Sequence, residues 1–260
     1  MKITKAVILA AGKGTRLLPL TRAIPKEMIR IGTKPIIEHV IDFLRTGGIE
    51  EILIIIGRKK EQIMDHLGSG KAYGVDISYK IQEDPRGTAD ATYYARNFVG
   101  EDCFVLIYGD NYFKPFESII KFLNFHINKK KAEATIVLHP VEDPTRFGLV
   151  NIDDQGKILK LIEKPTMNEA QDYLSDGKYL SIAGLLILNH SVFSYIKQIE
   201  KGIGNELWLT DAIELMRQDN REMFGYVYQG TRYDIGTFQS LLEADCMEQR
   251  EAKLMAKKEN

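Results

Sequence analysis

The chain has 260 residues, of which 44% are hydrophobic, and this is enough apolar side chain for one sizeable core without a second independent domain. Its 35 basic and 36 acidic residues leave a formal charge of -1, which argues against general binding to nucleic acid or to an acidic membrane surface. The 2 cysteines form no C-x-x-C pair and no apolar run approaches the roughly 20 residues of a membrane span, so we expect free thiols in a cytoplasmic protein without a secretory signal sequence.

The first half of the chain alternates between apolar strands and amphipathic helices. Continuous apolar runs bounded by turn residues predict strands at 5–11, 52–57, 76–81 and 103–108. Helical spacing of apolar residues predicts helices at 35–47, 61–67, 88–98 and 116–130. Strands that are apolar along their whole length and alternate with helices predict a doubly wound α/β fold, in which a mostly parallel sheet is covered by helices on both faces.

The pattern changes after about residue 132, where strands follow one another with few helices between them. The predicted strands lie at 135–141, 149–153, 157–162 and 181–188. Helices are predicted at 191–199, 209–219 and 237–253. This half therefore predicts a mixed-sheet extension, and the last helix becomes charged on all sides toward residue 260.

The first strand ends in a turn that suits a phosphate chain. The apolar run at 6–11 breaks into Gly12-Lys13-Gly14-Thr15-Arg16, where glycines without a Cβ let backbone N–H groups approach an anion. Arg16 and Lys26 add positive charge. A dinucleotide fingerprint would need a third glycine and a ribose-binding acid after the second strand, and a Walker A loop would need four residues between its glycines. The turn therefore predicts a phosphate site of another kind.

The string Gly12-x-Gly14-Thr15-Arg16, followed by Pro25-Lys26, resembles the signature of the sugar-1-phosphate nucleotidylyltransferases, which make nucleoside diphosphate sugars. The resemblance extends from about residue 5 to residue 244 and implies two catalytic cations. Arg16 would hold the β- and γ-phosphates of a nucleoside triphosphate, and Lys26 would lie between the α-phosphate and the sugar phosphate. The resemblance also implies that the first strand and its turn bind the nucleotide, through Leu9, Ala10, Ala11, Gly12, Gly14 and Thr15.

Further motifs match the nucleotide half of that family. Gly109-Asp110-Asn111 follows the fourth strand, at the carboxyl end where open parallel sheets bind ligands. The resemblance implies that Asp110 contacts the nucleotide and, with Asp234, holds Mg²⁺, which prefers hard oxygen ligands. It also implies that Gln82 and the backbone of Gly87 read a pyrimidine base, while Gly87 in addition suits the turn before a helix.

Three motifs in the family's order mark the sugar half. Phe147-Gly148-Leu149 resembles the sugar loop, Glu163-Lys164-Pro165 resembles the Glu-Lys-Pro box, and Ile182-Ala183-Gly184-Leu185 follows. The resemblance implies that the glutamate accepts hydrogen bonds from sugar hydroxyls and that the lysine meets the sugar phosphate. The sugar-phosphate-binding residues implied in this way are Asn111, Gly148, Glu163, Lys164, Ile182 and Gly184.

Together these motifs predict an enzyme that transfers a nucleotidyl group from UTP or dTTP to a sugar 1-phosphate, with glucose 1-phosphate as the first choice. Mg²⁺ is the predicted cofactor, and the predicted partners are the triphosphate and the sugar phosphate, without nucleic acid or membrane; a homo-oligomer is left open. We expect one nucleotidyltransferase domain over 1–244, with a nucleotide-binding half at about 1–131 and a sugar-binding half at about 132–244. A charged helical tail would follow at 245–260.

Alternatives remain open at this point. The stretch 24–28 resembles uridylyltransferases, whereas the stretch 237–241 resembles thymidylyltransferases, so another base or sugar is not excluded. A catalytically inactive regulatory or binding homologue would be expected to lose Arg16, Lys26, Asp110 or Asp234, and this chain keeps all four. A nicotinamide-dependent oxidoreductase is the least favoured function, because the third glycine and the ribose acid are missing.

Overall fold

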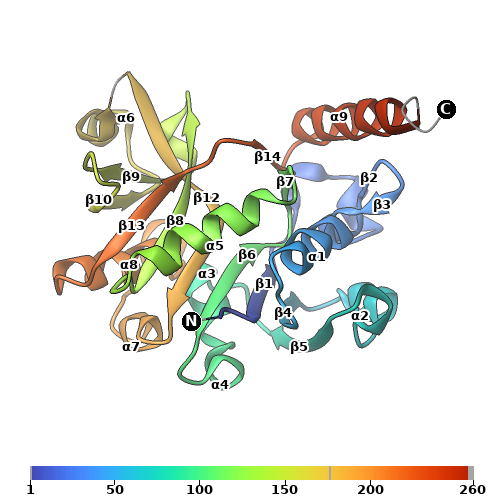
Figure 1. Ribbon diagram of the computed structural model, residues 1–260, viewed down its shortest axis with the longest axis horizontal. Coiled ribbons are helices and arrows are strands. Elements are labelled where there is room, and N and C mark those ends of the chain that lie inside the picture. The colour runs from blue at the N-terminus through green and yellow to red at the C-terminus, as the bar shows by residue number, and fades with distance from the viewer. Residues whose placement is uncertain (1, 176, 257–260) are drawn as a thin grey trace.

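The computed structural model describes residues 2–175 and 177–256, and its centre is a large sheet (Figure 1). The sheet follows the path β10-β9-β12-β6-β1-β4-β5, in which β1 pairs in parallel with β4 and β6, and β4 pairs in parallel with β5. This parallel part consists of β1 (Lys5–Ala10), β4 (Glu51–Gly57), β5 (Asp76–Gln82) and β6 (Cys103–Tyr108).

The side chains of β1 show why the parallel strands are apolar along their whole length. Ala6 and Ile8 belong to one buried cluster, whereas Val7 and Leu9 belong to another. Successive side chains of a strand point to opposite faces of the sheet. Since both faces of β1 are covered, every position must be apolar.

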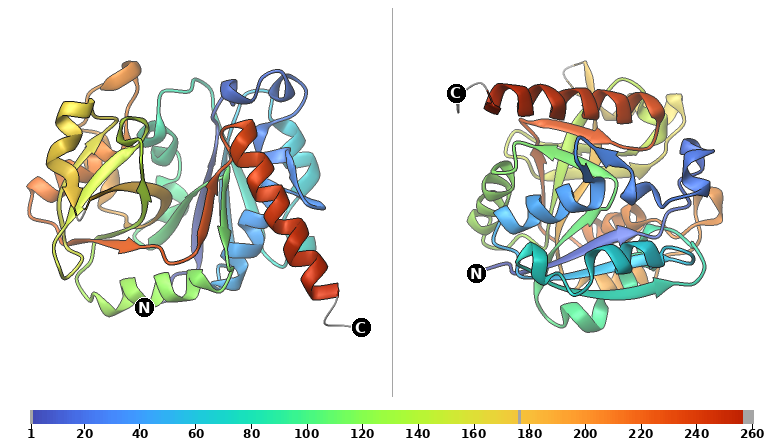
Figure 2. Two further views of the ribbon diagram at one scale, coloured as in Figure 1. Left: turned by 90° about the horizontal axis from the view of Figure 1, so that it is seen from above. Right: turned by 90° about the vertical axis from the view of Figure 1, so that its right-hand side faces the viewer.

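Helices pack on both faces of the sheet (Figure 2). The first buried cluster includes residues of α1 (Ile36–Thr46), α2 (Glu61–Leu67) and α5 (Ser118–Asn128). The second includes residues of α3 (Thr88–Tyr93), α4 (Arg96–Val99), α7 (Val192–Ile196) and α8 (Leu209–Gln218). The predicted doubly wound α/β fold is confirmed.

The long strand β12 (Lys178–Asn189) joins the two halves of the molecule, because it runs antiparallel to β6 and also pairs with β8 and β9. The mixed-sheet extension predicted after residue 132 contains both kinds of pairing, since β12 runs antiparallel to β8 and β13 runs parallel to it. Its other elements are β8 (Ala134–Val141), β9 (Gly148–Ile152), β10 (Ile158–Glu163), α6 (Met167–Ala170), β11 (Leu174–Ser175) and β13 (Met223–Val227).

The structure adds elements that the sequence pattern did not predict. Two small antiparallel sheets form, one from β2 (Arg30–Ile31) and β3 (Lys34–Pro35), the other from β7 (Asn111–Lys114) and β14 (Thr231–Asp234). The helix predicted at 88–98 is divided into α3 and α4. At the junction Tyr94 N donates to Ala91 O at 3.3 Å and Ala95 N donates to Thr92 O at 2.9 Å, so three-residue turns interrupt the regular α-helical pattern.

Helix α9 (Phe238–Ala256) continues unbroken across residue 244, where the sequence places the domain boundary. Asp245 Oδ1 accepts a hydrogen bond from Gly32 N at 2.7 Å, and the Lys114 ammonium lies 3.0 Å from Glu251 Oε2. The predicted tail is therefore helical as far as residue 256 and contacts the rest of the molecule at Asp245 and Glu251, and 257–260 lie outside the described residues. Among the described helices, none combines the length and the apolar character needed to cross a membrane.

Candidate active site

Two adjoining cavities open near the carboxyl ends of the parallel strands. The first has a volume of about 450 Å³ and the second of about 420 Å³. Residues that line both cavities are Arg16, Thr88, Tyr108, Asp110 and Trp208. The two cavities therefore meet at the ends of β1 and β6, where open α/β sheets bind ligands.

Most of the predicted site residues line one or the other of the two cavities. The first is lined by Lys26 together with Leu9, Ala11, Gly12, Gly14, Thr15, Gln82 and Gly87. The second is lined by Gly148, Glu163, Lys164, Ile182 and Asp234. Of the other predicted residues, Ala10, Asn111 and Gly184 lie behind these walls rather than among the lining residues.

The glycine turn packs tightly on the loop that carries Lys26. Gly14 has φ +64°, a left-handed conformation that favours glycine, and its carbonyl accepts a hydrogen bond from Thr21 Oγ1 at 2.8 Å. A Cβ on Gly12 would lie 3.4 Å from Lys26 Nζ. The turn thus brings exposed backbone close to the Lys26 ammonium, and Arg16 follows two residues after Gly14.

Lys26 and Asp110 form an ion pair, and Asp110 lies on the wall shared by the two cavities. Burial by itself would lower the pKa of the Lys26 ammonium, but Asp110 and Glu27 raise it well above its ordinary value. Burial would likewise raise the pKa of Asp110, but Lys26 and then Arg232 bring it below its ordinary value. Both groups are therefore charged at neutral pH, and a fixed cation stands at the junction of the cavities.

Asp234 reaches the same junction through the pairing of β7 with β14, in which it lies opposite Asn111. Its Oδ2 is 4.0 Å from a guanidinium nitrogen of Arg16. Burial raises the pKa of Asp234, and the nearby charge of Asp110 raises it further. The two carboxylates thus repel each other, which a bound divalent cation would relieve. Among the described residues, no group of three or more His, Cys, Asp or Glu side chains is arranged so that it could hold a metal ion by itself. Phosphate oxygens or water would therefore have to complete the coordination of such a cation.

Gln82 is buried at the end of β5, and its amide is fixed by the helix that follows. Its Nε2 donates to Asp90 Oδ2 at 2.7 Å and to the carbonyl of Gly87 at 3.4 Å. Gly87 has φ +112°, and a Cβ there would lie 2.3 Å from the carbonyl oxygen of Leu207. Only glycine fits this position, where the loop before α3 passes close to the chain before α8.

The carboxylate of Glu163 projects from the end of β10 into the second cavity. Its Oε2 accepts a hydrogen bond from Thr210 Oγ1 at 2.6 Å, and burial raises its pKa. Gly148 lies opposite in β9, where a Cβ would come within 2.9 Å of the same oxygen. The Lys164 ammonium lies 3.7 Å from the centroid of the Trp208 ring, so an aromatic face and a cation stand beside this carboxylate.

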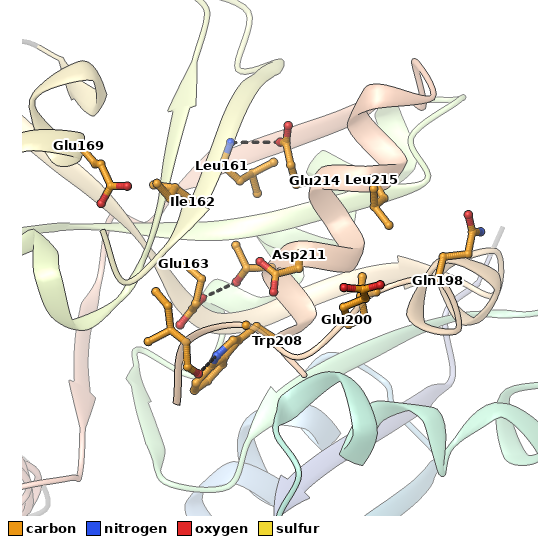
Figure 3. Close-up of a pocket in the computed structure, with 14 residues that line it drawn as sticks. Leu161, Ile162, Glu163, Glu169, Gln198, Glu200, Trp208, Asp211, Glu214 and Leu215 are labelled. Carbon is orange, nitrogen blue, oxygen red and sulfur yellow. Dashed lines mark hydrogen bonds between the residues drawn. The ribbon is translucent and has the colours of Figure 1, made fainter. Parts of the chain in front are cut away.

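Figure 3 shows a third cavity, of about 510 Å³, which adjoins the second at Glu163, Thr210 and Trp208. Its wall carries acidic side chains together with apolar ones, and its described lining residues include no lysine, arginine or histidine. A phosphate would be repelled there. Glu163 therefore marks the border between a region with cations and a region without them. The other acidic lining residues are Glu169, Glu200, Asp211 and Glu214.

Several lining residues of the second cavity were missed in the sequence. Arg232 lies two residues before Asp234, and its Nε donates to Asn111 Oδ1 at 2.8 Å. Trp208 is the single tryptophan of the chain, which is at best a weak signal. Arg146 and Thr210 carry no local signal, because only tertiary packing brings them to this wall.

Comparison with known proteins decides the family. The profile of the nucleotidyl transferase family matches residues 5–251. The chain belongs to the nucleotidyl transferase family. One similar protein is the low-salt glycan biosynthesis nucleotidyltransferase Agl11 of Haloferax volcanii, 36% identical over 93% of this chain and 65% of that protein, so the chain spans less than two thirds of its length. Another is the UTP–glucose-1-phosphate uridylyltransferase of Mycoplasma pneumoniae, 33% identical over 94% of this chain and 91% of that protein.

Solved structures of similar nucleotidyl transferases agree with this assignment. One, from Bacillus anthracis, is described as a glucose-1-phosphate thymidylyltransferase in complex with sucrose; it is 32% identical, with a TM-score of 0.81 over 94% of each chain. A UDP-glucose pyrophosphorylase complexed with UDP-glucose has a TM-score of 0.84 over 96% of this chain and 99% of that one, but at 23% identity it shows only the common fold. The predicted membership of the sugar-1-phosphate nucleotidyltransferases is confirmed.

Proposed function

We propose that this nucleotidyl transferase moves a uridylyl or thymidylyl group from UTP or dTTP onto a sugar 1-phosphate, with glucose 1-phosphate as the expected acceptor. A non-bridging oxygen of the sugar phosphate would attack the α-phosphorus. The bond from that phosphorus to the α,β-bridging oxygen would break, and pyrophosphate would leave with the electron pair. The observation that carries this proposal is the Lys26–Asp110 ion pair where the two cavities meet.

The proposed reaction joins two anions, so positive charge at their meeting point is the main requirement. Lys26, charged and directed into the first cavity, would neutralise the α-phosphate as the attacking oxygen approaches. Arg16 is 53% exposed at its side chain, so its guanidinium is free to turn from Asp234 toward the β- and γ-phosphates. The attacking phosphate oxygen carries no proton at neutral pH, and the reaction therefore needs no general base.

We further propose that the second cavity holds the sugar phosphate. Glu163 would accept hydrogen bonds from sugar hydroxyls, because its buried carboxylate would repel a phosphate but attract O–H donors. Lys164 lies beside it and would leave the Trp208 ring to meet the phosphate. Cationic side chains line the second cavity but not the described wall of the third, and Glu163 lies where the two cavities meet. This distribution supports an orientation of the sugar 1-phosphate in which the phosphate lies toward Asp110 and the sugar ring toward the acidic third cavity.

Asp110 and Asp234 would hold Mg²⁺, which supplies charge neutralisation for the triphosphate when it is bound. The donor set fits this ion, since both ligands are carboxylates and Asp110 raises the pKa of Asp234 through like-charge repulsion. Without Mg²⁺, the repulsion between the two carboxylates is offset by the positive charges of Arg232, Arg16 and Lys26.

The test is a substrate matrix with purified protein. UTP, dTTP, CTP and ATP are each combined with glucose, galactose and N-acetylglucosamine 1-phosphates, and both pyrophosphate and nucleotide sugar are measured. We expect equal amounts of the two products with UTP or dTTP and glucose 1-phosphate. Lys26→Met serves as the control for contaminating activity. Protein that binds triphosphate but yields no nucleotide sugar in any combination would favour the inactive homologue instead.

A further inference from the structure

A second ion pair lies buried behind the first, and neither of its residues is among the lining residues of the two substrate cavities. Glu27 is 0% exposed and Lys60 is 8% exposed. The Lys60 ammonium donates to both carboxylate oxygens of Glu27 at 2.8 Å each and to the carbonyl of Ala10 at 2.6 Å. An ammonium has three N–H donors, so these bonds use its full capacity.

The bonds of Lys60 join two loops and the end of a strand at the carboxyl end of the sheet. Ala10 ends β1 directly before the glycine turn, Lys60 lies between β4 and α2, and Glu27 follows Lys26 in its short helical turn. Gly109 packs on the stem of Glu27, since a Cβ there would lie 3.2 Å from Glu27 Cγ. The pair thus anchors the Lys26 loop to β1 and to the loop after β4.

The pair also acts electrostatically on Lys26. Against the effect of burial, both Asp110 and Glu27 raise the pKa of the Lys26 ammonium. Burial lowers the pKa of Lys60, and the negative charge of Glu27 offsets part of that decrease. Without Lys60, Glu27 would be an unpaired carboxylate in the interior, and the loop that carries Lys26 would lose its attachment to β1 and to the loop after β4.

We propose that Glu27 and Lys60 are positioning residues for Lys26: they hold its loop against the end of β1 and so keep its ammonium directed into the first cavity, next to Asp110. Their effect on the reaction rate rests on the proposed function, whereas their effect on Lys26 itself does not. A buried ion pair often contributes little net stability compared with an apolar pair of similar size. The effect of the pair on the position of Lys26 can therefore be separated by experiment from its effect on the stability of the protein.

The first experiment needs no enzyme activity. The protein is acetylated with an N-hydroxysuccinimide ester at one fixed pH, and the rate of modification of Lys26 is followed by mass spectrometry, with exposed Lys80 as internal reference. In the double variant Glu27→Met with Lys60→Met, the loop loses its attachment to β1, so the rate at Lys26 relative to that at Lys80 should be higher than in the wild type. An unchanged ratio would overturn the proposal that the pair holds the Lys26 loop in place.

The second experiment separates rate from stability with the double variant Glu27→Met with Lys60→Met. We expect a melting temperature close to that of the wild type, an unchanged KM for the triphosphate, and a kcat lower by about 10- to 100-fold, as when the partners that orient other active-site groups are removed. Lys60→Met alone should melt at a lower temperature, because it leaves Glu27 without its partner.

The matched control removes an ion pair at the opposite end of β1. Lys5 and Asp102 lie 2.7 Å apart there, and Lys5→Met with Asp102→Asn should leave kcat unchanged. A Glu27/Lys60 double variant that is folded and retains the wild-type kcat would show that the pair is only structural. If the wild type is inactive with every substrate pair, the proposed function fails, and the labelling experiment still decides the role of the pair.

Discussion

Replacing Glu163 by glutamine tests the proposed sugar side of the site with little change in shape. The side chain is held by Thr210 Oγ1, which donates to Oε2 at 2.6 Å, and among the described residues no side chain is paired with Oε1. Oε1 is therefore the acceptor that we expect to face a sugar hydroxyl. Glutamine keeps the volume but removes the charge and places an N–H₂ donor at one of the two oxygen positions.

The expected loss follows from the kind of hydrogen bond removed. A hydrogen bond to a charged group contributes about 1.5–3 kcal/mol, which corresponds to a decrease of roughly 10- to 150-fold in kcat/KM for the sugar phosphate. The KM for the triphosphate should change little, since the glutamate does not line the first cavity. Burial raises the pKa of Glu163, so in the wild type the KM for the sugar phosphate should increase as the pH falls through that raised value. This inflection should be missing in Glu163→Gln.

Both Michaelis constants are measured by coupled pyrophosphate release at saturating concentrations of the other substrate. Glu169→Gln is the matched control, because it makes the same substitution in the adjoining acidic cavity and glutamine can still form the capping box at the start of α6. An effect of Glu163→Gln mainly on the triphosphate KM would place the two substrates the other way round. Equal losses in the variant and the control would refute a specific role for Glu163.

Four further outcomes are expected. Lys26→Ala should lower kcat by roughly 10²–10³-fold while calorimetry shows nearly unchanged triphosphate binding, and a near wild-type kcat would refute its catalytic role. Chelation with EDTA should abolish turnover and added Mg²⁺ should restore it, so full turnover in EDTA would exclude the metal site. Gln82→Ala should raise the KM for the triphosphate roughly tenfold and reduce the preference for UTP over CTP, whereas an altered sugar-phosphate KM alone would contradict base reading. Burial lowers the pKa of His126 to about 4, so the unfolded state binds more protons between pH 6.5 and 4 and stability falls as the pH decreases. Urea denaturation should show this loss, up to about 3 kcal/mol, in the wild type and a smaller one in His126→Gln.

The parallel half of the fold could be predicted because its signals are local. The strand predicted at 103–108 is β6 and the helix predicted at 61–67 is α2, with the same bounds. β6 is buried on both faces, α2 is amphipathic, and a turn residue follows each of them. Residues close together in the sequence are therefore enough to predict both elements. β7 and β14 offer no such pattern, since each has four residues and is stabilised by a partner more than a hundred residues away.

Motifs identified residue types for the candidate site but not the contacts between them. The sequence singled out Asp110 and Asp234 separately, and only the pairing of β7 with β14 places them near one another. Glu27 lies in the stretch 24–28, whose resemblance to uridylyltransferases gave no sign of an ion pair with Lys60. Lys60 ends the basic run Arg58-Lys59-Lys60, which is typical of a solvated loop, whereas the structure buries this last lysine on a carboxylate from another loop.

Asn111 shows most directly what a motif leaves undecided. It adjoins Asp110, yet its side chain points behind the cavity wall, where a Cβ on Gly184 would come within 2.5 Å of its Nδ2. Gly184 has φ +70° and is therefore restricted twice, by its backbone and by this close approach. Asn111 Oδ1 instead accepts a hydrogen bond from Arg232, which does line the second cavity. If Asn111 affects the sugar phosphate, it does so by orienting that guanidinium, and Arg232 is the side chain through which its effect must be measured.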